Sequence, residues 1–255
     1  MIIKDVKGSR KHVLDLLERN DFLKVLNNLL TTSGATVSET DVYQPRGYTD
    51  PTEMELRDFG PKYLADLINW SLIRKWWPDR PARSPQWDLL ITCTAAAKRG
   101  LVLVEAKAHE AELEWGGKSV KEGPSEDSLH NHQRIGECIA EACRSLNEKM
   151  PGVNIQRDNH YQLANRVAFT WKLAQCSMPV VLLYLGFLGD TGISEVGVPF
   201  RDNDRWQRVM EFYMQGVLPQ SFPETQLEFE SGGSMIMSVR SLRVMEVSQA
   251  GVNRS

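Results

Sequence analysis

Three charged residues stand at the ends of two apolar segments of this sequence. Glu105 and Lys107 close the run LVLVEAK, and Asp88 lies near the start of the earlier run WDLLITC. Carboxylates and ammonium groups in such places are costly to bury unless they pair with one another or hold a metal ion. The residue types therefore allow a structural ion pair or a charged site that binds a cation.

A hairpin of two strands would bring these charges together. The run 101–107 is too short for an average helix and is rich in Val and Leu, which predicts a buried strand, and the run 87–93 predicts a second strand just before it. Side chains alternate along a strand, so Glu105 and Lys107 share one face. An antiparallel hairpin would then bring Asp88 toward both of them.

The composition and charge are typical of a soluble globular protein. Hydrophobic residues make up 42% of the 255 residues. The net charge of -3 argues against polyanion binding over the whole surface, although a local basic patch could still bind a polyanion. We expect one domain with elaborations. No segment predicts a signal peptide or a membrane span, so we expect a cytoplasmic protein with no membrane partner. The four cysteines lack Cys-x-x-Cys spacing, which argues against structural zinc.

Amphipathic segments before the hairpin predict helices that would cover the sheet. Residues 9–31 have the apolar spacing of one or two helices. A segment that begins at Asp50 or Thr52 predicts another helix, which carries Glu53 and Glu55. Both carboxylates would then lie on the helix that precedes the hairpin.

Further elements are predicted after the hairpin. Helical stripes cover 126–150 and 159–176, and the second of them places Gln162 and Arg166 four residues apart on one face. The run Pro179–Gly186 is apolar on both faces, which predicts a central strand covered on both sides. We also expect a helix at 204–216 and a strand at 235–239.

Asp88 followed by Glu105-Ala106-Lys107, on a hairpin between helices, resembles the PD-(D/E)xK nuclease superfamily, which has the restriction-endonuclease-like fold. The family core is a helix, three mainly antiparallel strands, a helix and a strand, and this sequence supplies most of it in that order. The sequence departs from the motif at one point, because a tryptophan directly precedes Asp88 and the nearest proline is Pro85.

The resemblance implies an α/β fold with a central mixed β-sheet flanked by helices, in a single domain over 1–255. The nuclease-like core would span about 53–189, which is roughly half of the chain. It would lie between an N-terminal helical extension, 1–52, and a C-terminal extension, 190–255.

The resemblance also implies a metal site. Asp88 and Glu105 would bind a divalent cation with help from the backbone carbonyl of Ala106, and Glu55 would be a further ligand, with Glu53 as the second choice. Hard oxygen ligands of this kind suit Mg²⁺ or Mn²⁺ rather than zinc.

The implied activity is metal-dependent hydrolysis of phosphodiester bonds in DNA, with RNA as another substrate class. Lys107 would orient the attacking water and stabilise charge on phosphorus, and Gln162 and Arg166 would support the site. The resemblance allows a homodimer. Any motor domain would belong to a separate chain.

Other interpretations of the same residues stay open. Glu105 and Lys107 could form a salt bridge at a strand end with Asp88 as a turn cap, and Gln162 and Arg166 could be an exposed helical pair. The fold could serve as a binding or assembly module that does not cleave. A small-molecule α/β enzyme is disfavoured because no nucleotide-cradling glycine motif or nucleophile elbow is found.

Overall fold

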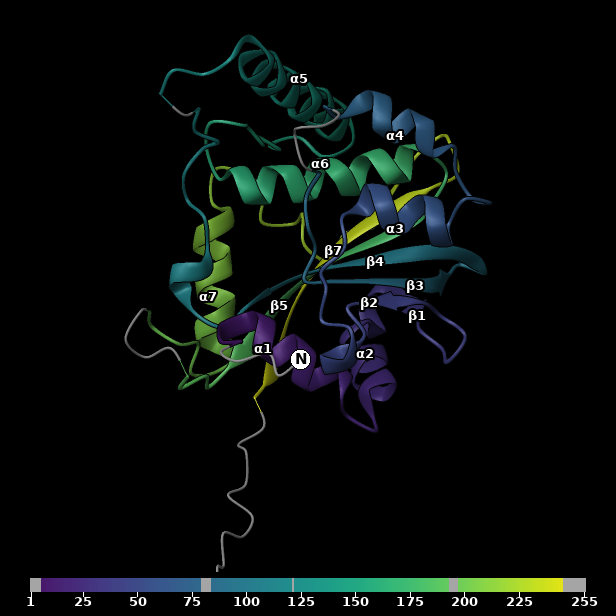
Figure 1. The fold of residues 1–255 in the computed structure, drawn as a ribbon, viewed down its shortest axis with the longest axis vertical. Coiled ribbons are helices and arrows are strands. Elements are labelled where there is room, and N and C mark those ends of the chain that lie inside the picture. The colour runs from purple at the N-terminus through teal and green to yellow at the C-terminus, as the bar shows by residue number, and fades with distance from the viewer. Residues whose placement is uncertain (1–5, 79–83, 121, 193–196, 245–255) are drawn as a thin grey trace, which may run out of the picture.

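A mixed β-sheet forms the centre of the computed structural model, which describes residues 6–78, 84–120, 122–192 and 197–244 (Figure 1). Within these residues the sheet has seven strands in the order β1-β3-β4-β5-β7-β6, with β2 also pairing β3. The fold is therefore α/β with a mixed sheet flanked by helices, as predicted. The strands are β1 (Ala35–Thr36), β2 (Tyr43–Gln44), β3 (Leu89–Ala95), β4 (Lys98–Lys107), β5 (Pro179–Leu188), β6 (Leu227–Glu228) and β7 (Ser234–Arg243).

The predicted hairpin is confirmed. β3 and β4 pair antiparallel from Leu89↔Val104 to Ala95↔Lys98. Ala96 and Ala97, both with positive φ, make the two-residue turn between the strands. Asp88 therefore stands just before β3, at the end of the sheet where β4 finishes.

β5 is the central strand that its apolar run predicts. It pairs parallel with β4 on one side and with β7 on the other, and all ten of its residues are buried. A parallel neighbour requires a long crossover connection, which the helices between β4 and β5 provide.

Helices cover both faces of the sheet (Figure 1). Most of the predicted helices are confirmed within one to three residues of their expected ends. On one face lie α1 (Gly8–Leu17) and α2 (Phe22–Leu29), and on the other lie α3 (Leu56–Tyr63), α4 (Trp70–Trp76), α5 (Glu126–Lys149), α6 (Tyr161–Gln175) and α7 (Asn203–Met214). Short 3₁₀ turns occur at η1 (Thr31–Ser33), η2 (Gly47–Thr49) and η3 (Glu110–Glu112).

The helix expected from Asp50 or Thr52 begins later, at Leu56. Glu55 has extended backbone and forms an isolated antiparallel bridge with Gln86, so pairing with the segment before β3 replaces helical hydrogen bonding. Glu53 also lies outside the helix.

The sheet differs from the family core in its first strand. Among the described residues, only β3 and β4 lie between α4 and α5, where the core would place three strands. The other neighbours of β3 are β1 and β2, which precede α3 in the chain. The residues assigned to the two extensions thus contribute strands to the same sheet.

The alternation of side chains divides the hydrophobic core into two layers. Leu101 and Leu103 of β4 face α3 to α7, whereas Val102 and Val104 face α1 and α2. In the described part of the chain, no helix combines the length and apolar character needed to cross a bilayer.

Candidate active site

The site is organised by the register of β3 against β4. Asp88 directly precedes Leu89, the first paired residue of β3, and its carboxylate accepts a hydrogen bond from the Ala106 N–H, so it lies beside Glu105. Glu105 projects to the face of the sheet covered by α6. Lys107 projects to this face too, two residues beyond Glu105.

Glu105 lies between two cations. Its Oε1 lies 2.6 Å from Lys107 Nζ, and its Oε2 lies 2.6 Å from Arg166 Nε of α6. Glu105 is only 2% exposed, and both cations are buried as well. Burial alone would raise the pKa of Glu105, but Arg166 and Lys107 hold it below its usual value, so this carboxylate stays ionised.

Asp88 is held by the backbone of β4. Its Oδ2 accepts a hydrogen bond of 2.7 Å from the Ala106 N–H, which is the only side-chain hydrogen bond of Asp88 within the described residues. Burial, together with the Glu105 carboxylate, raises the pKa of Asp88 to about 7. Asp88 is therefore a carboxylate whose negative charge a bound cation would stabilise.

The Ala106 carbonyl faces the same side as its N–H. In a strand, the N–H and C=O of one residue point to the same neighbouring strand. The Ala106 N–H is directed at Asp88, and Asp88 precedes Leu89, the first residue of β3. The Ala106 carbonyl therefore points past the start of β3.

Two acids precede α3, and they have different surroundings. Glu55 accepts hydrogen bonds from Arg57 and from the backbone and hydroxyl of Ser84. Glu53 is half-buried, and its pKa is raised by burial and by the Glu105 carboxylate, against the effect of Arg10 at 3.5 Å. Of the two, Glu53 is the one whose charge is coupled to Glu105.

Arg166 is fixed from several directions. Besides the Glu105 contact, it donates to the Gln86 carbonyl at 2.8 Å and to Asn165 Oδ1 at 3.0 Å, and its guanidinium lies 4.6 Å from the centre of the Trp87 ring. The side-chain oxygen of Gln162, one turn earlier on α6, has no hydrogen-bond partner in the described part of the chain. The structure therefore brings Arg166, and not Gln162, to Glu105.

Sequence reasoning did not select Tyr184 and Trp206, which also lie at this site. Tyr184 is in register with Glu105, and Trp206 packs on Gly186, which is in register with Lys107. A tyrosine at the middle of the aliphatic β5 run was the available signal. Trp206 lies on α7, and no local pattern in the sequence indicates where this helix packs on the sheet.

A buried polar cluster of two histidines and Asp190 lies between α1 and the end of β4. His109 Nε2 lies 2.8 Å from Asp190 Oδ2, and His12 Nε2 of α1 lies 3.2 Å from the other oxygen of that carboxylate. These contacts hold α1 near the end of β4. Arg10, which lies 3.5 Å from Glu53, is also on α1.

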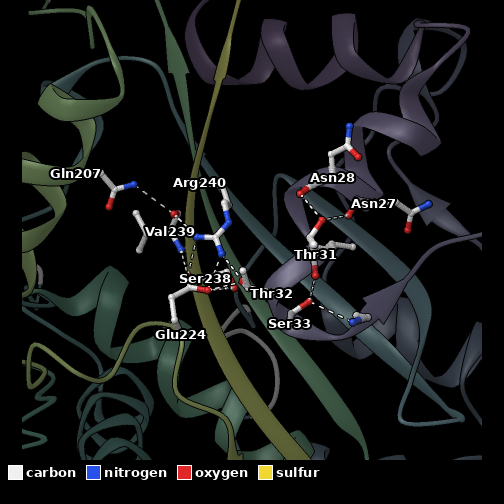
Figure 2. Close-up of polar contacts among 12 residues, drawn as sticks. Asn27, Asn28, Thr31, Thr32, Ser33, Gln207, Glu224, Ser238, Val239 and Arg240 are labelled. Atoms are coloured by element: carbon white, nitrogen blue, oxygen red, sulfur yellow. Dashed lines mark hydrogen bonds and ion pairs between the residues drawn. The ribbon is translucent and has the colours of Figure 1, made fainter.

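A second polar cluster, far from the charged site in the sequence, joins η1 to β7 (Figure 2). Arg240 makes a two-pronged contact with Glu224, at 2.8 and 2.6 Å, and Thr32 donates to the same carboxylate at 2.6 Å. It borders a pocket of about 1060 Å³ between α7 and β7. Because Arg240 and Glu224 neutralise each other, we interpret this cluster as one that stabilises the fold and not as a binding site.

The chemistry of the donor set fits a hard divalent cation. Asp88, Glu105 and the Ala106 carbonyl supply oxygen ligands, and Asp88 has an oxygen that no hydrogen bond occupies among the described residues. No three His, Cys, Asp or Glu side chains in that part of the protein are grouped as a ready metal site. Since Lys107 and Arg166 already contact Glu105, a cation would have to share its oxygens with them.

Comparisons of this chain with models of protein families, with curated proteins and with solved structures find no match.

Proposed function

We propose that this protein is a metal-dependent phosphodiesterase that hydrolyses DNA, with Asp88, Glu105 and Lys107 at its active site. The proposal is carried by one observation: Asp88, held by the Ala106 N–H, lies near enough to Glu105 that the Glu105 charge, together with burial, raises the pKa of Asp88 to about 7. Two neighbouring carboxylates repel each other, so the site favours a bound cation.

Asp88, Glu105 and the Ala106 carbonyl would hold Mg²⁺ or Mn²⁺, with Glu53 as the neighbouring acid. Bound there, the cation would polarise the phosphodiester and make a nearby water more acidic. The resemblance to the nuclease superfamily in the order of Asp88 and Glu105-Ala106-Lys107 supports this assignment, and RNA is the alternative polymer.

Lys107 would orient the attacking water. Its ammonium is fixed by Glu105 Oε1 at 2.6 Å and retains two further N–H groups. Burial would lower the pKa of Lys107, but the Glu105 and Asp88 carboxylates raise it, so the ammonium stays charged and donates hydrogen bonds to oxygen. Arg166 neutralises Glu105 from the other side.

The test is a cleavage assay on plasmid, linear and single-stranded DNA with Mg²⁺ or Mn²⁺. We expect cleavage that is lost in Lys107→Ala and in Glu105→Gln. Lys98→Ala is a matched control, because Lys98 lies at the exposed end of the same strand and, within the described residues, its side chain hydrogen-bonds only to the Gly232 carbonyl. Activity that survives Lys107→Ala would contradict the assignment.

A second candidate function is a nuclease-like module that binds or assembles without cleaving. It is favoured by one observation: both Glu105 oxygens already contact cations, Lys107 and Arg166. Titration of Mn²⁺ by calorimetry separates the two functions. The module predicts no heat that depends on Asp88, and the phosphodiesterase predicts heat that Asp88→Asn removes.

A further inference from the structure

Three polar side chains lie next to one another at the site. Asp88, just before β3, accepts a hydrogen bond from the Ala106 N–H and lies near Glu105, and Glu105 is paired with Tyr184 by the parallel register of β4 with β5. Glu105 and Tyr184 project to the face covered by α6 and α7. The phenol of Tyr184 is therefore the next polar group after the two carboxylates.

The hydroxyl of Tyr184 has no hydrogen-bond partner within the described residues, although the residue is fully buried. A buried hydroxyl without a partner is destabilising, so native structures rarely keep one. Tyr213, a second buried tyrosine on this face, does have a partner, since its hydroxyl donates to the Glu114 carbonyl at 3.0 Å. Of these two buried tyrosines, the one beside Glu105 is thus the one whose hydroxyl lacks a partner among the described residues.

A second donor without a partner lies at the next register pair on this face. Lys107 is in register with Gly186, and a Cβ at Gly186 would lie 2.4 Å from Cδ2 of Trp206. The glycine therefore allows the indole of Trp206 to pack directly on β5. Trp206 is fully buried, and its Nε1 also lacks a hydrogen-bond partner in the described part of the chain.

Besides the two carboxylates, the polar groups that the registers place near Lys107 can act as hydrogen-bond donors. The Lys107 ammonium and the indole N–H of Trp206 donate hydrogen bonds and accept none, and a neutral phenol donates well to an anionic oxygen. Burial raises the pKa of Tyr184 well above its usual value, so the phenol keeps its proton. A set of donors beside two carboxylates has the chemistry of an oxyanion site, not of a second cation site.

We propose that Tyr184 and Trp206, together with Lys107, bind the non-bridging oxygens of a phosphate group. The proposal rests on the proposed phosphodiesterase function and adds to it two residues that contact the substrate from β5 and α7. The phosphate would lie with its oxygens toward these donors and with its reacting face toward Asp88 and Glu105.

The first measurement is binding of inorganic phosphate and of the dinucleotide TpT, by calorimetry without divalent cations, so that no cleavage occurs. We expect Tyr184→Phe to lose about tenfold in affinity for both probes, as for one hydrogen bond to an anion. Trp206→Phe should weaken binding in the same direction. Tyr43→Phe on β2, at the far side of β3, is the matched control and should bind like the wild type. Equal affinity in Tyr184→Phe, or no phosphate binding by the wild type, overturns the subsite.

The second measurement separates contact with phosphate from a structural role. Without ligand, Tyr184→Phe should melt at the same temperature as the wild type or higher, because the hydroxyl it removes has no partner. Tyr213→Phe should melt lower, because it loses the bond to Glu114. A drop in Tyr184→Phe as large as that in Tyr213→Phe would show a structural hydroxyl and overturn the proposal.

These results also distinguish the subsite from the hydrolysis itself. Phosphate binding that needs Tyr184, in a protein that cleaves no DNA with either metal, would retain the subsite and reject the phosphodiesterase. Cleavage by the wild type with unchanged binding and kcat in Tyr184→Phe would reject the subsite and retain the phosphodiesterase. If both hold, Tyr184→Phe should lower kcat more than it raises KM.

Discussion

Arg166 Nε of α6 lies 2.6 Å from Glu105 Oε2 of β4, on a carboxylate whose other oxygen already contacts Lys107. The loss of either cation would leave one oxygen of this buried carboxylate without its ion-pair partner in a medium of low dielectric constant, which is destabilising. This relationship couples the helix that covers the site to the strand that carries it.

Replacing Arg166 should therefore destabilise the fold. We expect Arg166→Met to cost about 3 kcal/mol of unfolding free energy, because it leaves Glu105 with one cation. Chemical denaturation measures it. The double variant Arg166→Met/Glu105→Gln should cost less than the sum of the single changes, and additive costs would contradict the coupling. Arg134→Met, in an exposed pair with Glu137, is the control and should cost less than about 1 kcal/mol.

The raised pKa of Asp88 makes stability depend on pH in a definite direction. Between the ordinary pKa of Asp, near 4, and about 7, the folded protein binds a proton at Asp88 that the unfolded chain releases, so stability falls as pH rises through this window. Asp88→Asn cannot lose a proton. In the absence of divalent cations it should match the wild type near pH 4 and exceed it at pH 8, by on the order of 1 to 3 kcal/mol.

Urea denaturation of both proteins at several pH values measures this difference. Groups that titrate in both proteins cancel in the comparison, so the difference reports Asp88. A gap of constant size from pH 4 to pH 8 would mean that the Asp88 carboxyl titrates at its ordinary pKa.

Glu53 and Glu55 form a matched pair for testing the metal site. Glu53 is coupled to the charge of Glu105, so Glu53→Gln should weaken Mn²⁺ binding about tenfold, as for the loss of one acidic neighbour. Glu55 is engaged by Arg57 and Ser84, so Glu55→Gln should bind Mn²⁺ like the wild type but unfold more easily. Calorimetry and thermal melting distinguish the two effects. Metal binding that needs Glu55 and tolerates Glu53→Gln would reverse the assignment.

Gly186 should not tolerate a side chain. Gly186→Ala places a methyl group 2.4 Å from the indole of Trp206, within a packed layer, and should cost about 2 to 3 kcal/mol of stability. Gly116→Ala is the control, because among the described residues, its chain neighbours aside, no heavy atom lies within 4 Å of the Cβ it adds. Equal melting temperatures for the two variants would show that Trp206 has room to move.

Local sequence patterns were sufficient for the elements whose hydrogen bonds are local or whose partner strand follows at once. The stripes of α5 and α6 and the apolar runs of β3 and β4 predict elements that the structure confirms. The charged trio on the hairpin could also be placed, because the short turn at Ala96 fixes the register that brings Asp88, just before β3, beside the end of β4.

Long-range pairing decided the rest. Glu55 lies outside the predicted helix because its backbone forms a β-bridge with Gln86 instead of helical hydrogen bonds. Local propensity does not indicate this pairing, because Gln86 is distant in the sequence. Gln162 and Arg166 share a helix face in the sequence, but only the tertiary packing of α6 decides which of them contacts Glu105.

The sequence by itself determined which charges end the hairpin, since alternation and turn length are local properties of the chain. Only the tertiary structure decided what surrounds those charges. Tyr184 and Trp206 come from segments at least 77 residues beyond Lys107, and they meet it because β5 pairs parallel with β4 and α7 packs on Gly186. Such contacts depend on the register and packing of the whole sheet, which no window of the sequence contains.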